Sequence, residues 1–388
     1  MSLLRNRSLI AATLGHFSVD MYSGMLPLIL LVLTDPLGLS YSQVGLASMV
    51  YSLASSVSQP FFGWLGDKRG SRPMAVVGVA AIAMTVGVMR FVDQYLILLV
   101  LAVIAGLGSA AFHPQGAMLA AQTPNAQRGS AASIFMLGGN TGYAFGPIFG
   151  TAAFGLAGGF MPEMLAMLGL MQAGVVYWTL AEHQREFERA AGSAPLIHTT
   201  VRAATSVIVT LGLVIFLRSW VQSTISTYVP QVYKSQGFST EFAGNVLFSI
   251  LLPLAIGGLI GGTLSDRIGR RRVLILSTGL IGPALWGLLH SAGPAAFLLG
   301  PIVGVAVGMS MPVTLVMAQN LVPRGLGLMS GVVLGFTFIA GAVGVGVNGV
   351  VADQVGLLPT MSFNALLPLA AAALAFFLPD DRPAALSR

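Results

Sequence analysis

The chain has 388 residues, of which 55% are hydrophobic and only 8% are charged, and its formal net charge is +6. Soluble domains ordinarily carry about 25% charged residues, so this composition excludes an ordinary soluble protein. The absence of cysteine excludes disulfides and thiolate metal sites. A net positive charge can indicate nucleic-acid binding, but the placement of the basic residues indicates a membrane topology instead, and we expect no nucleic-acid partner.

Long apolar stretches follow one another along the whole chain, separated by short polar breaks. They cover residues 8–33, 43–64, 74–92, 97–121, 130–152, 160–181, 205–232, 241–264, 273–290, 294–318, 327–351 and 358–378. Most exceed the roughly 20 residues that a helix needs to cross a bilayer. The alternation of apolar and polar residues typical of a membrane barrel is missing. The sequence therefore predicts an all-α integral membrane protein with twelve transmembrane helices in a lipid bilayer.

The first apolar stretch follows Arg5 and Arg7 and has some features of a signal peptide. It is longer than a secretory core, however, and no small-residue cleavage site follows it. We interpret it as a retained first helix.

The basic residues follow the positive-inside rule. Sixteen of the nineteen fall at the termini or in every second loop: Arg5, Arg7, Lys68, Arg69, Arg72, Arg128, Arg185, Arg189, Arg202, Arg267, Arg270, Arg271, Arg272, Arg324, Arg382 and Arg388. Arg90 and Lys234 lie on the opposite side, and Arg218 lies inside a helix. Because arginine and lysine concentrate in cytoplasmic loops, both termini are predicted to be cytoplasmic in a multi-pass protein of the cell inner membrane.

The longest polar stretch covers residues 182–204 and divides the chain into two related halves, 1–181 and 205–388. The segment Gly63-Trp-Leu-Gly-Asp-Lys-Arg-Gly-Ser-Arg72 is repeated 199 residues later as Gly262-Thr-Leu-Ser-Asp-Arg-Ile-Gly-Arg-Arg271. Weaker echoes pair 121–129 with 318–325. The sequence therefore predicts two six-helix pseudo-repeats joined by a cytoplasmic linker. Such repeats place the substrate near the midplane between the halves, and rocking of the halves alternates access to it.

The repeated Gly-x-x-x-Asp-x-x-Gly-x-Arg pattern resembles the signature loop of the major facilitator superfamily. Four further segments are similar to the fosmidomycin-resistance branch of its drug exporters: Gly15-His-Phe-Ser-Val-Asp20, Gly108-Ser-Ala-Ala-Phe-His-Pro114, Phe135-Met-Leu-Gly-Gly-Asn140 and Leu378-Pro-Asp-Asp-Arg382. The resemblance covers the whole chain and implies the major facilitator fold, but it does not identify the substrate.

Asp20 is the clearest candidate for proton coupling, because among the thirteen acidic residues it alone is clearly buried within a predicted span. A carboxylate at the centre of a membrane helix costs roughly 2.5–3.5 kcal/mol, so such residues are usually functional. His16 precedes it by one turn and shares its helix face. The competing interpretation is that Asp20 only bonds neighbouring helices.

Arg218 lies deep within the predicted helix over 205–232, and Gln222 follows one turn later on the same face. A guanidinium beside an amide suits an anionic or polar ligand. An ion pair with Asp20 and an arginine that extends toward the outer surface are the alternatives.

His113 precedes Pro114 in the fourth predicted helix and is a second candidate for proton coupling, since histidine titrates near neutral pH. Drug exporters often carry an arginine three residues before Gln-Gly in this helix, and Phe112 occupies that position here. The sequence leaves open whether His113 replaces this arginine or Asp20 carries the proton. Further candidates for lining the substrate site are Gln115, Asn140, Gln59 and Tyr22.

By resemblance, Asp67 and Arg72 of the signature loop, with Arg128 nearby, act as gating residues, and Asp266 is the repeat's counterpart. A carboxylate here accepts hydrogen bonds from a helix N-terminus or pairs with arginine. A purely topological loop is the alternative. Gly138, Gly142 and Gly146, followed by Pro147 and Gly150, predict close helix packing, and part of this run resembles the antiporter motif of exporters.

These features predict a secondary active transporter that exports a small amphipathic or anionic compound in exchange for protons. A proton-coupled uptake symporter for a metabolite is the alternative, and a non-transporting receptor is a weaker one. The phosphate-binding motif Gly-x-x-x-x-Gly-Lys and the metalloprotease motif His-Glu-x-x-His are both absent from the sequence, so we expect no enzyme activity. We expect a monomer that needs no cofactor or metal.

The charge pattern makes a direct prediction about topology. Protease-cleavable tags placed at Ser2, within 182–204 and at Arg388 should all be protected from external protease in right-side-out membrane vesicles. Cleavage of any one of them from outside would contradict the predicted orientation, and a tag in the loop that carries Lys234 should serve as the accessible control.

Overall fold

The computed structural model describes residues 6–121, 128–155, 161–180, 205–291, 293–319, 321 and 326–379. The first half contains α1 (Arg7–Leu37), α2 (Tyr41–Arg69), α3 (Ser71–Val88), α4 (Tyr95–Ala121), α5 (Arg128–Gly150) and α6 (Met161–Thr179). The second contains α8 (Thr205–Ser235), α9 (Thr240–Ile268), α10 (Arg270–His290), α11 (Ala296–Gln319), α12 (Leu326–Val355), α13 (Leu357–Asn364) and α14 (Leu367–Ala375). Short 3₁₀ turns cover Met89–Phe91 and Gly293–Ala295, and a π-helical turn, Thr151–Gly155, follows α5. The described residues contain no strand, which confirms the all-α fold class.

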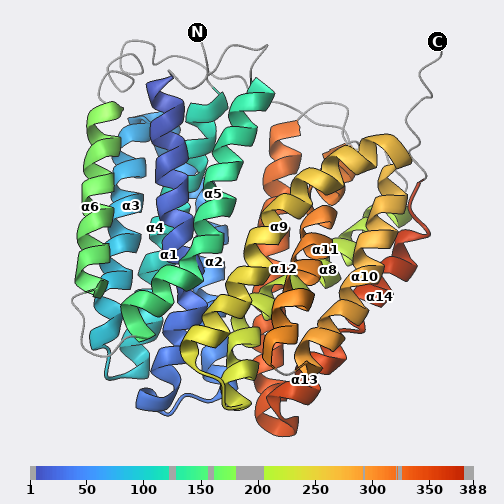
Figure 1. The fold of residues 1–388 in the computed structure, drawn as a ribbon. Coiled ribbons are helices and arrows are strands. Elements are labelled where there is room, and N and C mark those ends of the chain that lie inside the picture. The colour runs from blue at the N-terminus through green and yellow to red at the C-terminus, as the bar shows by residue number, and fades with distance from the viewer. Residues whose placement is uncertain are drawn as a thin grey trace, which may run out of the picture. The chain divides into compact units, whose positions relative to one another are not determined.

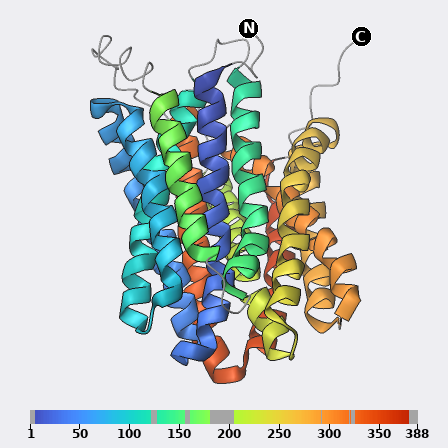
Figure 2. The same cartoon turned by 60° about the vertical axis from the view of Figure 1, so that its left-hand side comes forward.

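Contacts divide the chain into two compact units. The first unit comprises Met1–Leu39, Val50–Ala194 and Ser239–Gly244, and the second comprises Ser40–Met49, Pro195–Phe238 and Asn245–Arg388. In the first, α1 lies against α5 and α4, and α3 lies between α4 and α6 (Figures 1 and 2). In the second, α10 lies against α11 and α14, and α8 against α12. The expected linker, 182–204, lies outside the described residues.

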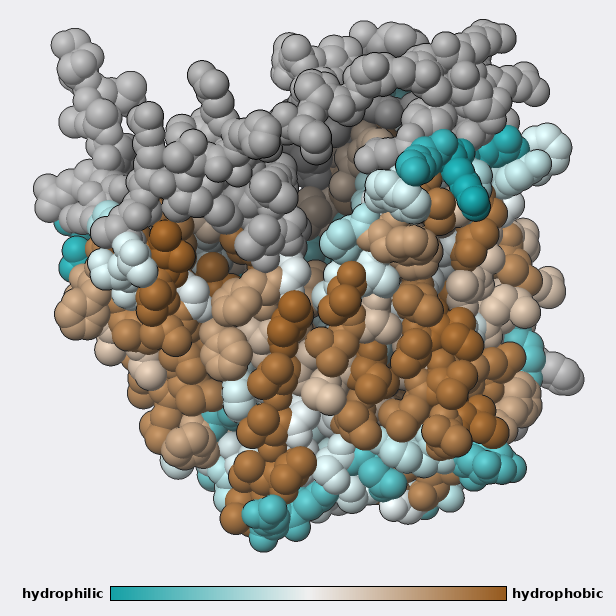
Figure 3. Space-filling model, turned by 180° about the vertical axis from the view of Figure 1, so that it is seen from behind, coloured by the Kyte–Doolittle hydropathy of each residue, from teal (hydrophilic) through white to brown (hydrophobic). Residues whose placement is uncertain are grey.

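Most of the described helices are suited to hydrocarbon. With α13 and α14 counted together as one span, Leu357–Ala375, nine of them are long and apolar enough to cross a membrane. The remaining α2, α5 and α6 fall outside this set, and α2 is rich in serine. On the face shown in Figure 3, hydrophobic residues gather across the middle, and hydrophilic ones gather at the lower edge and at the upper right. This banding is expected when helices cross a bilayer, since helices satisfy their own backbone hydrogen bonds there.

The repeated signature loops have the same backbone geometry in both halves. Gly70 joins α2 to α3 with φ 85° and ψ 157°, and Gly269 joins α9 to α10 with φ 95° and ψ 145°. This region of backbone space is open essentially to glycine alone. The second glycine of the Gly-x-x-x-Asp-x-x-Gly pattern is therefore required by the turn itself.

The glycines of α5 let it approach α1 closely, as their spacing predicted. A Cβ on Gly142 would lie 2.8 Å from the Cα of Phe17, and one on Gly146 would lie 2.6 Å from the Cα of Gly24. Gly138 meets the Thr13 carbonyl in the same way. Backbone contact at this distance is typical of small-residue interfaces in membranes.

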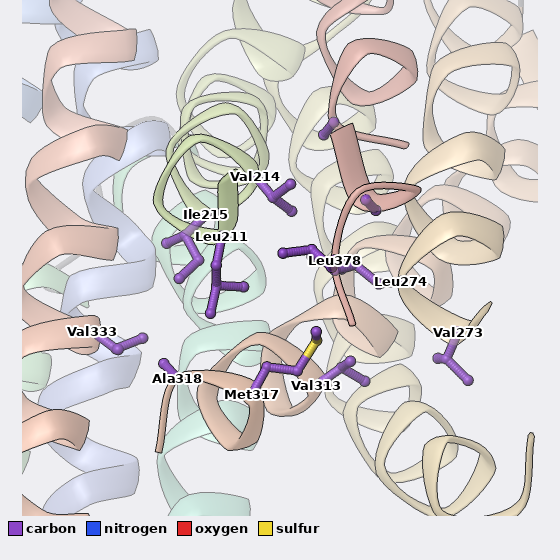
Figure 4. Packing of buried hydrophobic residues seen from close by; sticks show 12 residues of the cluster. Leu211, Val214, Ile215, Val273, Leu274, Val313, Met317, Ala318, Val333 and Leu378 are labelled. Carbon is purple, nitrogen blue, oxygen red and sulfur yellow. The ribbon is translucent and has the colours of Figure 1, made fainter. Parts of the chain in front are cut away.

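The second unit has an apolar core between α8, α10, α11, α12 and α14 (Figure 4). Its buried members are Leu211, Val214, Ile215, Val273, Leu274, Val313, Met317, Ala318, Val333, Ala371, Ala375 and Leu378.

The twelfth predicted segment, 358–378, is interrupted, which the sequence prediction missed. It forms α13 and α14, separated by a turn at Ala365 and Leu366. Pro368 has no N–H with which to bond the carbonyl of Asn364, so the helix ladder fails there. The side chain of Asn364 accepts a hydrogen bond from Trp220 Nε1 of α8 at 3.2 Å, which fixes the end of α13.

The α1–α5 interface predicts a contrast between two glycines. Gly146→Ala should lower the thermal unfolding midpoint of the purified protein, because overpacking of a tight interface costs about 1–3 kcal/mol. The matched control is Gly174→Ala in α6, where an added Cβ meets nothing within 4 Å. That variant should be neutral or slightly stabilising. Equal midpoints for the two variants would show that close approach at Gly146 is dispensable.

Candidate functional site

Helix α1 places His16 and Asp20 one turn apart near its middle. His16 Nε2 lies 3.2 Å from Asp20 Oδ2, which confirms that the two side chains share a face. The His16 side chain is 5% exposed, whereas that of Asp20 retains 18% of its surface. The carboxylate is thus held within the bundle yet still reachable by a small ion.

Helix α4 brings His113 to the other oxygen of the same carboxylate. Its Nε2 lies 3.0 Å from Asp20 Oδ1, and its side chain is 24% exposed. The sequence left Asp20 and His113 as separate alternatives for proton coupling. In the structure they belong to one cluster with His16, which we call the His–Asp–His triad.

Each of the two imidazole rings is held by one backbone carbonyl. His16 Nδ1 lies 2.8 Å from the carbonyl oxygen of Phe135 in α5, and His113 Nδ1 lies 2.8 Å from that of Ser109 in α4. The His16 ring also stacks on Phe135, with centroids 4.0 Å apart. A Cβ on Gly139 would lie 2.6 Å from Asp20 Oδ2, so glycine is needed there for α5 to approach the triad. The rings are therefore fixed with Nε2 directed at the carboxylate.

A set of hydroxyl groups that sequence reasoning did not single out surrounds the triad. Ser109 Oγ lies 3.2 Å from His113 Nδ1 and accepts from Ser55 Oγ of α2, also at 3.2 Å. Tyr51 donates to Ser23 Oγ at 2.5 Å. No sequence signal distinguishes Ser23, Tyr51 and Ser55, whereas Ser109 lies within the segment 108–114 that resembles the drug-exporter branch.

Two imidazoles and a carboxylate also form a donor set that suits a divalent transition metal. The three ligand atoms lie within 4.8 Å of one another. Both contacts to Asp20 also have the length of ordinary hydrogen bonds, so protons between these atoms can hold the three side chains together without a metal.

Arg218 lies in α8 of the second unit and is 2% exposed, so it does not extend to the surface. Its Nη1 donates to Gln222 Oε1 at 3.0 Å, and its Nη2 lies 3.4 Å from Ser219 Oγ. The predicted association with Gln222 is therefore present. Nε is buried without a partner, and among the described side chains of the second unit no carboxylate pairs with this guanidinium. A cation with only neutral partners remains available to an anion.

The other expected lining residues differ in what they contact. Gln115 is fully buried and donates through Nε2 to the Phe62 carbonyl at 2.8 Å, while its Oε1 has no partner. Tyr22 is also buried, and its hydroxyl donates to the Leu165 carbonyl of α6. Both therefore link helices of the first unit. Gln59 and Asn140 are partly buried.

The side chains of three expected gating residues, Asp67, Arg128 and Asp266, lie outside the described part of the structure. Arg72 Nε donates to the Tyr177 carbonyl at 2.9 Å, and its guanidinium lies 3.7 Å from the centre of the Tyr177 ring. This arginine therefore links α3 to the end of α6.

Asp353 of α12 was not singled out from the sequence. It accepts hydrogen bonds from the first N–H groups of α2, from Tyr41 at 2.7 Å and Ser42 at 3.0 Å. A carboxylate at a helix N-terminus is favoured by the helix dipole. The contact lies within the second unit and is the arrangement that the sequence predicted for Asp67 and Asp266.

Comparison with known proteins agrees with this architecture. The sequence model described as Major Facilitator Superfamily matches residues 9–252 and 211–388. The uncharacterized MFS-type transporter YfnC of Bacillus subtilis is 33% identical over 386 residues, covering 96% of this chain and 93% of the relative. The fosmidomycin resistance protein of Escherichia coli is 29% identical over 381 residues, covering 96% and 92%.

More distant relatives and a solved structure extend the same picture. The multi-drug resistance efflux pump PmrA of Streptococcus pneumoniae is 23% identical and covers 84% of each chain. The crystal structure of a bacterial homolog to the human lysosomal transporter Spinster, in an inward-facing and occupied conformation, aligns with a TM-score of 0.79 at 16% identity and covers 95% of each chain. That structure supports the fold alone. With its two helical halves and its family match over nearly the whole length, this chain belongs to the major facilitator superfamily of membrane transporters.

Proposed function

We propose that this transporter exports a small amphipathic or anionic compound in exchange for protons, by alternating access. The observation that carries the proposal is the His–Asp–His triad, a cluster of three titratable side chains held inside a membrane bundle. Acidic and basic groups are costly there, and those that persist usually lie on ion or proton pathways. The partial exposure of Asp20 and His113 leaves the triad open to exchange with water.

Arg218 supports the anionic character of the substrate. Its guanidinium is buried, and its described partners are the neutral side chains of Gln222 and Ser219. A carboxylate or a phosphorus oxyanion would meet the unpaired Nε–H and gain charge-assisted hydrogen bonds. Fosmidomycin is the first compound to test, because a relative named for resistance to it aligns along almost the whole chain.

Export is favoured over uptake by two observations. The relatives named for resistance or efflux include the fosmidomycin resistance protein and the pump PmrA. The glycines of α5 also make the close contact with α1 that their resemblance to the antiporter motif suggested. In an uptake symporter proton and substrate would move in the same direction, so the sign of substrate movement under an imposed pH gradient separates the two. A non-transporting receptor would show no movement.

Gating and location complete the proposal. We assign Asp67, Arg72, Arg128 and Asp266 to contacts that open and close on the cytoplasmic side, with both chain termini on that side of the cell inner membrane. The working unit is a monomer, since each half supplies its own candidate charged group.

The triad predicts a separation of coupling from binding. In proteoliposomes with an imposed pH gradient, Asp20→Asn should abolish gradient-driven fosmidomycin transport but retain substrate exchange, because asparagine neither carries a proton itself nor supplies the negative charge that favours a proton on the two imidazoles. Amounts of reconstituted protein should be matched to wild type. Equal gradient-driven transport by the two proteins would remove Asp20 from the coupling machinery.

Arg218 predicts a loss of affinity. Arg218→Ala should raise the half-saturating concentration of an anionic substrate roughly 10- to 100-fold, since hydrogen bonds to charged groups contribute about 1.5–3 kcal/mol. Arg218→Lys keeps the charge without the planar fork and should have an intermediate effect. Lys234→Ala, which removes the same charge at the end of the same helix, is the control. An unchanged half-saturating concentration in Arg218→Ala would place the substrate elsewhere.

A further inference from the structure

The protons of the His–Asp–His triad can be counted from its hydrogen-bond partners. A backbone carbonyl oxygen only accepts hydrogen bonds. Because the Nδ1 atoms of His16 and His113 both lie 2.8 Å from such oxygens, both must carry a proton. This fixes the tautomer of each neutral ring as Nδ1–H, which leaves Nε2 with a lone pair.

The protons between the two Nε2 atoms and Asp20 can be counted in the same way. The two Nε2 atoms lie 3.2 and 3.0 Å from the two oxygens of Asp20, and an ionised carboxylate also only accepts. With both rings neutral and Asp20 ionised, each contact would set one lone pair against another. Each therefore requires a proton. A protonated Asp20 can supply only one of the two, so at least one ring must become an imidazolium in every arrangement that satisfies both contacts.

We propose that His16, Asp20 and His113 form a single two-proton site. Relative to two neutral rings and an ionised carboxylate, the occupied site holds two extra protons, so its net charge changes from −1 to +1. Which atoms share the protons does not alter this count, because coupled groups titrate as a unit. The site deepens the proposed function, on which it rests for its role in transport, by setting the exchange ratio at two protons per cycle.

Proton loading also has a structural consequence within the first unit. His113 belongs to α4 and Asp20 to α1, and their contact requires a proton. His16 belongs to α1 but is anchored to α5 through Phe135. The loaded triad therefore ties α4 to α1, and loss of both protons turns two hydrogen bonds into two repulsive contacts. Proton release is thereby linked to a change in helix contacts.

The surroundings of the triad supply no other charge among the described residues of α1–α6. The phenols within the bundle are Tyr22, Tyr51 and Tyr143, and Tyr51 interacts electrostatically with Asp20. A phenol ordinarily titrates near pH 10 and stays neutral at physiological pH. The remaining described ionisable groups lie near helix ends: Arg7, Asp35, Tyr41, Lys68, Arg69, Arg72, Tyr95, Glu163 and Tyr177. Within the described part of the first unit, the two histidines and the carboxylate therefore have no other charged side chain beside them.

The direct test uses nitrogen NMR of the full chain in nanodiscs, after dialysis against a chelator. The chain has five histidines, and single His→Gln variants assign their signals. At pH 5 the rings of His16 and His113 should both carry protons on both nitrogens. As the pH rises both should lose the Nε2 proton and keep the Nδ1 proton, which is the tautomer that the carbonyl contacts impose. Either ring in the opposite tautomer would overturn the proposal.

The exchange ratio is tested with fosmidomycin, by finding the pH difference that just balances an imposed substrate gradient at zero membrane potential. For each proton exchanged per substrate molecule, a difference of one pH unit balances about a tenfold substrate concentration gradient. Wild type should balance about 100-fold per unit. His16→Gln, whose amide still donates to Asp20 but cannot release that proton, should balance about tenfold. His290→Gln is the control, since His290 is exposed and bonds only the Trp286 carbonyl of its own helix. A ratio of one proton in wild type would contradict the proposal.

The NMR measurement tests the two-proton site, and the transport measurement tests the proposed function, so the two can fail separately. If fosmidomycin does not move in either direction while the NMR shows both imidazolium rings, the proposed function fails for this compound and the two-proton site stands. If one equivalent of a divalent metal survives the chelator and both Nε2 atoms remain free of protons, the site is a metal site and the proposal is wrong.

Discussion

Hydrocarbon provides no hydrogen-bond partner, so every polar group within the bundle must find one in the protein. The backbone meets this requirement by forming helices. Many hydroxyl groups meet it locally, as Ser23 and Thr85 do by donating to carbonyls one turn earlier on their own helices. A carboxylate cannot do so, because helix carbonyls offer it no proton. Asp20 instead contacts two imidazoles, that of His16 on its own helix and that of His113 on α4, and His16 in turn contacts the Phe135 carbonyl of α5, so these contacts link α1, α4 and α5.

Close packing of α1 and α5 makes that arrangement possible. His16 reaches the Phe135 carbonyl because α5 lies at backbone distance from α1, and this distance depends on Gly138, Gly142 and Gly146. Gly139, on the adjacent row, leaves the space that the triad occupies. The glycine run and the titratable cluster are thus parts of one structure, in which a packing motif positions a polar site.

The sequence predicted the parts of this structure that depend on local pattern. Hydropathy located the membrane segments, four-residue spacing placed His16 beside Asp20, and the internal repeat identified the equivalent turns at Gly70 and Gly269. Contacts between distant segments could not be read in the same way. Nothing in the sequence shows that α4 lies against α1, so His113 and Asp20 remained alternatives until the structure placed them 3.0 Å apart.

Other features escaped prediction for equally physical reasons. The break between α13 and α14 follows from one proline within a segment whose hydropathy is continuous, and membrane helices elsewhere in this chain contain proline without breaking, as at Pro27 of α1. Whether a helix breaks at proline depends on the partners available to the freed groups, and here Trp220 donates a hydrogen bond to the side chain of Asn364 at the end of α13. Asp353 was overlooked because its role depends on the start of α2, more than 300 residues earlier in the chain.

The two buried charges of this transporter are stabilised in different ways. Asp20 contacts two imidazoles, which can carry protons, so its charge can be compensated from within the first unit. Arg218 keeps its charge at all physiological pH values, and its described partners within the second unit are neutral, which is why we propose that a ligand anion compensates it. In the proposed cycle, a ligand anion and a pair of protons change the charge of these two sites in opposite directions. If the conformations that open to each side of the membrane differ in how well they tolerate net charge, the two sites are coupled without any direct contact between substrate and proton.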